Sequence, residues 1–175
     1  MARDLKHPVW NVYDVLRTVR LNVLYNQIKL SKVVNWNTFF EISIAITAPS
    51  SALASIHIFQ GVIGQELWRF LVAITAVLAV VKPFLGFINK IKAKEALISS
   101  YEIAFHELEK LRIEIHNTQK YDNGHMLKLE EVRTTLHDVQ KKYPSTGKGD
   151  KKLASMLKAQ VETEFPSASF YLPPR

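Results

Sequence analysis

The residue types in this 175-residue chain that could do chemistry do not occur at the spacings that catalysis requires. His106 and Glu107 open the sequence HELEK, which looks like a zinc-protease helix, but Lys110 stands where the second metal-binding histidine is needed. The basic segment 141–152, KKYPSTGKGDKK, contains Gly-Lys but lacks the earlier glycine and the preceding strand of a phosphate-binding loop. The chain has no cysteine, so thiolate metal sites, disulfides and cysteine nucleophiles are excluded. We therefore predict that the protein is not an enzyme and uses no cofactor or metal.

Other polar residues lie inside two apolar segments, 39–59 and 67–88, which are separated by seven residues. As a helix, each segment is long enough to cross about 30 Å of hydrocarbon. Lys and Arg precede the first segment and follow the second, whereas the connecting QGVIGQE contains neither. This distribution is typical of a membrane hairpin with both ends in the cytoplasm. We predict a two-transmembrane helical hairpin over residues 36–88; a buried hairpin in a soluble helical protein is the alternative.

Small and hydroxyl-bearing side chains recur along one face of each apolar segment. The candidate pore-lining or helix-packing residues are Ser43, Thr47, Ser51, Ser55, Thr75, Ala79 and Lys82, together with Glu41. Close packing of membrane helices explains such a stripe, since small residues let helices approach. A functional explanation is that the stripe lines water in an oligomeric pore. Because both helices enter from the cytoplasm, we also expect Glu41 and Lys82 to lie near the same face, where they can form an ion pair.

The flanking regions predict further helices, so the expected fold class is an all-α membrane protein. Residues 1–35 should form an amphipathic basic helix that lies on the membrane surface or packs against a later helix. We expect the helix after residue 88 to continue without a break, to end near Tyr121-Asp-Asn-Gly124, and to return as an antiparallel cytoplasmic hairpin over 89–143. Residues 144–175 should form a basic linker, a short helix and an extended tail whose aromatic residues dock onto a groove. The linker is either simply solvated or binds a lipid or nucleotide phosphate.

Apolar residues of the first cytoplasmic helix repeat by sevens, which is typical of a coiled coil that needs partner helices. The candidate oligomerisation residues are Ile91, Ile98, Tyr101, Phe105, Leu108 and Ile115. The net charge of +7 is concentrated around the apolar hairpin, where Lys and Arg attract anionic lipid head groups. We therefore expect the lipid bilayer and further copies of the chain as partners, and no nucleic acid.

The order of these parts resembles the SLATT family of bacterial two-transmembrane effectors. The resemblance rests on a basic helix with aromatics over 10–32, a small-residue helix over 39–59, the QGVIGQE turn, a second helix ending in Lys82-Pro83, and the uninterrupted KIKAKEALISSYEIAFHELEKL. It implies an oligomeric inner-membrane protein, with both termini cytoplasmic, that forms pores in antiphage (abortive infection) defence. A partner sensor protein or a nucleotide second messenger would trigger it, because the chain contains no sensor domain of recognisable type.

Overall fold

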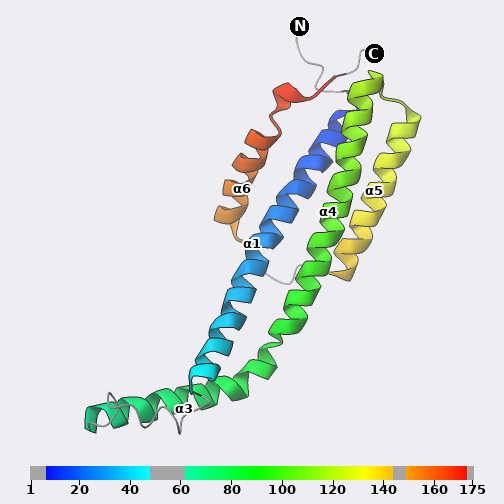
Figure 1. Ribbon diagram of the computed structural model, residues 1–175. Coiled ribbons are helices and arrows are strands. Elements are labelled where there is room, and N and C mark those ends of the chain that lie inside the picture. The colour runs from blue at the N-terminus through cyan, green and yellow to red at the C-terminus, as the bar shows by residue number, and fades with distance from the viewer. Residues whose placement is uncertain (1–6, 48–61, 144–148, 173–175) are drawn as a thin grey trace. The chain divides into compact units, whose positions relative to one another are not determined.

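The computed structural model describes residues 7–47, 62–143 and 149–172, and this part of the chain is mostly helical, with no strand. The elements are α1 (Trp10–Thr47), α3 (Val62–Leu85), α4 (Phe87–Thr118), α5 (Asn123–Lys142), α6 (Lys151–Glu164) and the short 3₁₀ helix η2 (Ser167–Ser169). Figure 1 shows their order along the chain. The all-α prediction is confirmed.

α1 is one continuous helix of 38 residues, where the sequence predicted an amphipathic helix followed by a separate membrane segment beginning at residue 39. The intervening SKVVNWN contains neither proline nor glycine, so nothing in it removes a backbone hydrogen bond or favours a helix end. The predicted boundary at residue 35 therefore falls inside a helix. Of the predicted first membrane segment, the structure describes only residues 39–47, at the end of α1; residues 48–59 lie outside the described part.

α3 and α4 are separated at Gly86, which the sequence did not predict. Gly86 has φ +58°, in the left-handed region that glycine enters at no steric cost, and its N–H donates to the Pro83 carbonyl at 3.3 Å. Pro83 has no N–H for the helical ladder and so weakens the last turn of α3. From Phe87 to Thr118, α4 then runs unbroken, as the absence of proline and glycine predicted.

The chain divides into two compact units. The helical-bundle unit comprises Met1–Lys29 and Ala93–Arg175, and the apolar unit comprises Leu30–Lys92. α1 and α4 each contribute residues to both units.

The helical-bundle unit is built on one hydrophobic core that α1, α4, α5, α6 and the tail share. On α1 the buried residues follow a spacing of three and four, so one stripe faces the core. The main core residues are Val12, Tyr13, Leu16, Val19 and Val23 from α1, Tyr101, Phe105, Leu108, Leu111 and Ile115 from α4, Leu129 and Leu136 from α5, Val161 from α6, and Phe165 and Phe170 from the tail. The N-terminal helix thus packs against later helices, which resolves the two alternatives that the sequence left open.

The α4–α5 turn occurs where the sequence predicted it, but its chemistry differs. The left-handed residue is Gln119, with φ +57°, which lies before the predicted turn residues. Asp122 caps α5, since its carboxylate accepts from the His125 N–H at 3.2 Å while the Asp122 N–H donates to His125 Nδ1. Asn123 and Gly124 therefore begin α5 instead of ending α4.

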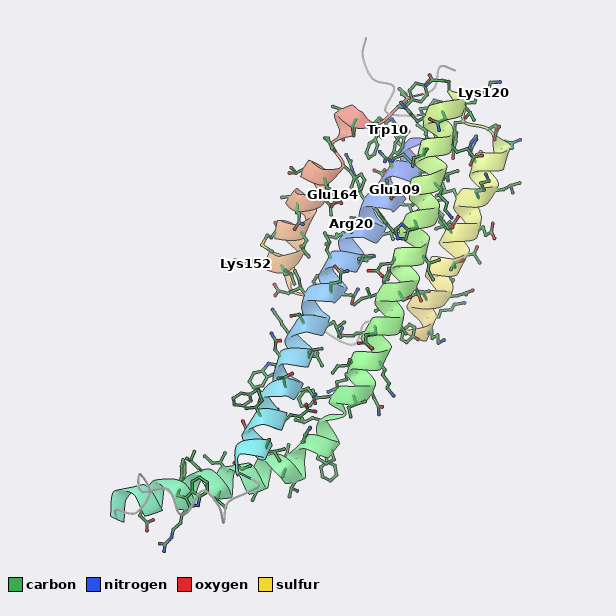
Figure 2. All side chains as sticks on the ribbon, in the orientation of Figure 1. Trp10, Arg20, Glu109, Lys120, Lys152 and Glu164 are labelled. Carbon is green, nitrogen blue, oxygen red and sulfur yellow. The ribbon has the colours of Figure 1, made fainter. Side chains whose placement is uncertain are left out.

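Polar contacts hold α6 and the tail against α1. The Arg20 guanidinium on α1 pairs with the Glu164 carboxylate on α6 at 2.9 Å, and Figure 2 shows these two labelled side chains between the helices. Arg17 donates to the Phe165 carbonyl, and the Tyr13 and Phe170 rings stack with centroids 4.1 Å apart. The aromatic tail does dock, as expected, and its groove belongs to this chain's own helices.

Candidate membrane-spanning segment and its polar cluster

α3 is the helix in the described part of the chain that is long and apolar enough to cross a membrane. The window Trp68–Leu85 has a mean hydropathy of 1.8, and none of it is buried within the structure. Its 18 residues extend about 27 Å as a helix, close to the roughly 30 Å of a hydrocarbon core. Large apolar side chains are exposed along it, namely Phe70, Leu71, Ile74, Val77, Val80, Val81 and Phe84. An apolar surface of this extent is unusual in water and indicates a site of lipid or protein contact.

Glu41 on α1 and Lys82 on α3 form an ion pair, with 3.1 Å between Lys82 Nζ and Glu41 Oε1. This pairing was predicted and is confirmed. The Glu41 side chain is 53% exposed and the Lys82 side chain 26%, so the pair lies at the surface of the apolar unit. Two opposite charges in contact reduce the cost that either would carry alone in a membrane segment.

Asn37 completes this polar cluster, and the sequence analysis missed it. Its Nδ2 donates to the same Glu41 Oε1 at 2.9 Å, one helical turn away along α1. Its Oδ1 is buried and meets no hydrogen-bond donor among the described residues. The spacing of four residues between Asn37 and Glu41 was the signal available, because side chains at i and i+4 lie on one helix face.

Aromatic residues lie next to Asn37 and Glu41 in the sequence of α1 and contact one another. Trp36 contacts Phe39 and Phe40, with ring centroids 5.9 and 6.3 Å apart, and Phe40 contacts Phe87 at the start of α4 at 5.4 Å. Trp36 and Phe39 remain mostly exposed. Exposed aromatic rings beside charged groups at one end of an apolar helix are typical of a membrane–water interface.

The predicted hydroxyl stripe is described only in part. The Thr75 hydroxyl donates to the Leu71 carbonyl of its own helix at 2.9 Å, so its donor needs no partner from another helix. Ser43 is half-buried and Ala79 is exposed. For Thr47 only the backbone is described, and Ser51 and Ser55 lie outside the described residues. The structure therefore brings Glu41 and Lys82 together and leaves a continuous stripe as a prediction.

Most predicted oligomerisation residues lie in the core of the helical-bundle unit. Ile98, Tyr101, Phe105, Leu108 and Ile115 are all buried, while Ile91 is half-buried in the apolar unit. The sequence analysis interpreted this stripe as a seam between chains. Tyr101, Phe105, Leu108 and Ile115 instead share one core with residues of α1, α5, α6 and the tail of the same chain. Burial within one chain removes the reason for which partner helices were predicted at these five positions.

The residues that resembled a zinc helix form an ordinary surface ion pair. Lys110 Nζ lies 2.7 Å from Glu107 Oε1, and His106 is exposed. Across the described ranges, no three His, Asp or Glu side chains gather as metal ligands would. Residues 144–148 of the basic segment 141–152, which include its Gly-Lys, lie outside those ranges. Asp150, in the same segment, caps α6 by accepting from the Leu153 N–H at 3.1 Å.

Comparison with protein-family models, curated protein sequences and solved structures finds no match to this chain.

Proposed function

We propose that this protein is a membrane-inserted effector that assembles with further copies of itself into a pore. The observation that carries membrane insertion is the apolar surface of α3, whose Trp68–Leu85 window has no buried residue in the described part of the chain. At about 25 cal/mol per Å², moving even one large apolar side chain such as Phe84 from water into lipid contributes roughly 1.5–3 kcal/mol. Several such side chains on one helix together favour insertion strongly.

The proposed topology is a hairpin of residues 39–59 and α3, with both ends in the cytoplasm. Lys29 and Lys32 precede the hairpin, Lys90, Lys92 and Lys94 follow it, and the connection has no Lys or Arg. The ion pair between Glu41 and Lys82 supports this topology, because antiparallel spans place these two positions at the same membrane face.

Self-assembly into a pore is the second part of the proposal, and the polar cluster supports it. Glu41 is half-exposed, and the Asn37 Oδ1 lacks a donor among the described residues. In a bilayer such groups need head groups, water or polar groups of another chain. Copies that meet along this face would surround a wet path. The resemblance to the SLATT family provides the proposed biological setting, a bacterial inner-membrane pore in antiphage defence that a sensor protein or nucleotide signal opens.

Three measurements test this proposal, one on membranes and two on the purified protein. Carbonate washing of membranes should leave the protein in the pellet, and release into the supernatant would contradict insertion. Reconstituted liposomes should leak trapped ions, and detergent particles should have the mass of an oligomer. Glu41→Gln should change the leak rate, whereas Glu95→Gln, an exposed carboxylate in the bundle, should not. Tight liposomes formed by a monomer would contradict the pore.

A non-conducting anchor is the second candidate, and one feature of the helical-bundle unit favours it. A groove of about 400 Å³ lies between α4 and α5, with Leu111 and Val132 among its lining residues and the exposed Ile103 at its side. Apolar surface in a groove with charged rims suits a soluble partner. Tight liposomes together with stable membrane retention would favour this function.

A further inference from the structure

A small pocket of about 180 Å³ lies in the helical-bundle unit, where the tail crosses α1 and α4. Its aromatic lining comes from Tyr13 on α1 and from Phe170 and Tyr171 on the tail, while α4 supplies Arg112, Ile113 and His116. Pockets for drug-sized ligands usually measure about 300–1,000 Å³. This pocket therefore fits a single ring with one attached group rather than a nucleotide.

Arg112 has hydrogen-bonding capacity that the described residues do not use. Its Nε is buried and has no acceptor among them. Its Nη2 lies 3.6 Å from Glu109 Oε1, longer than a good charge-assisted hydrogen bond, and its Cζ lies 5.9 Å from the Phe165 ring centroid. A guanidinium presents five N–H donors in a planar fork, so several donors remain available.

Among the other polar side chains that line the pocket, His116 favours an anion, because its ring can donate a hydrogen bond. The imidazole of His116 lines it with its ring centroid 5.6 Å from that of Tyr171. The Tyr13 hydroxyl already donates to the Tyr171 carbonyl at 2.6 Å, so it closes the pocket rather than binding a guest as a donor. None of the described residues that line the pocket is acidic. Glu109, which forms the 3.6 Å ion pair with Arg112, does not line the pocket.

We infer that this pocket binds a small oxyanion, phosphate or carboxylate, that carries a planar apolar group. The guanidinium of Arg112 would bind two oxygens of the anion side by side, as the fork geometry favours, and His116 would donate to one of them. The apolar group would pack against Ile113 and the ring of Tyr171. The inference does not depend on membrane insertion or on a pore.

Titration of the full-length protein with phenyl phosphate tests the inference, followed by calorimetry or NMR at constant ionic strength. We expect saturable binding, with inorganic phosphate binding more weakly because it lacks the ring. Benzoate distinguishes the two oxyanions, since a preference for it would assign the pocket to carboxylates. Arg112→Gln should weaken binding at least roughly tenfold, because it removes a charged donor pair.

Arg133→Gln on α5 is the matched control, since Arg133 pairs with Glu130 away from the pocket and should leave binding unchanged. Arg112→Lys retains the charge without the fork, so it tests the site if Arg112→Gln fails to fold; it should bind several-fold more weakly than the original chain. Equal binding by Arg112→Lys and the original chain, equal losses in Arg133→Gln, or no saturable binding of any of the three anions would overturn the inference.

Discussion

The two compact units of this protein place their apolar side chains in opposite ways. In the helical-bundle unit, Leu108 is 0% exposed and packs in a core drawn from α1, α4, α5, α6 and the tail. In the apolar unit, Val80 is 66% exposed, and most of the described large apolar side chains of α3 are exposed too. Both units are helical, so the difference lies in whether the same chain covers the apolar face. An exposed apolar face like that of α3 is typical of a surface that contacts lipid or another protein.

Truncating one apolar residue in each unit should give the largest difference in stability, because one residue is buried in a core and the other is exposed. Leu108→Ala leaves a cavity in a closed core and should destabilise the helical-bundle unit by about 2–5 kcal/mol. Val80→Ala removes methyl groups that touch no core and should change that stability by less than about 0.5 kcal/mol. Hydrogen–deuterium exchange of the α4 and α5 amides measures both. Similar losses in both variants would mean that α3 belongs to the core of the bundle.

Introducing a charge into each unit tests whether α3, and not α4, inserts into a membrane. Val77 on α3 and Ile103 on α4 are equally exposed, each 61%. Val77→Arg should make the free energy of membrane insertion about 3 kcal/mol less favourable, because an arginine near the middle of a span is costly. The equilibrium constant for insertion should therefore fall roughly a hundredfold. Ile103→Arg should have little effect on insertion. The fraction of protein that resists carbonate extraction is the measurement, and equal retention of both variants would contradict a spanning α3.

The sequence predicted the helices and the apolar faces well where one physical signal dominates. The stripe at Val12, Leu16, Val19 and Val23 predicted the buried face of α1, and opposite charges on antiparallel spans predicted the pairing of Glu41 with Lys82. The long apolar run predicted α3 because hydropathy over 18 residues needs no knowledge of tertiary contacts.

Features that depend on the rest of the fold were harder to predict. A heptad stripe looks the same whether its partner is another chain or the chain's own α1, so Leu108 and Ile115 were assigned to an oligomer. Gly86 lies inside an apolar run whose composition says nothing about φ, and the break after α3 was missed. The pocket at Arg112 forms only when the tail meets α4, about 50 residues away in the sequence, and no local pattern indicates it.

Alkaline pH should destabilise the helical-bundle unit but not the apolar unit, and we expect this effect to be the smallest of the three. Burial raises the pKa of Tyr13 from 10.0 to about 12. A group whose pKa is higher in the folded state contributes its stability fully below pH 10 and loses it as the pH rises toward 12. The helical-bundle unit should therefore lose about 2–3 kcal/mol over that range. α3 contains no tyrosine, so the apolar unit should remain in the membrane while the bundle loosens.

Tyr13→Phe tests this cause directly. The variant loses the hydrogen bond to the Tyr171 carbonyl, which should cost about 1 kcal/mol at neutral pH, but it has no hydroxyl to ionise at pH 11. Limited proteolysis of membrane-bound protein between pH 9 and 12 should therefore show a steeper loss of protection in the original chain than in Tyr13→Phe. Tyr143→Phe, at the end of α5, is the matched control and should behave like the original chain. If Tyr13→Phe loses protection as steeply as the original chain, the alkaline transition belongs to another group, and burial of the Tyr13 hydroxyl is not its cause.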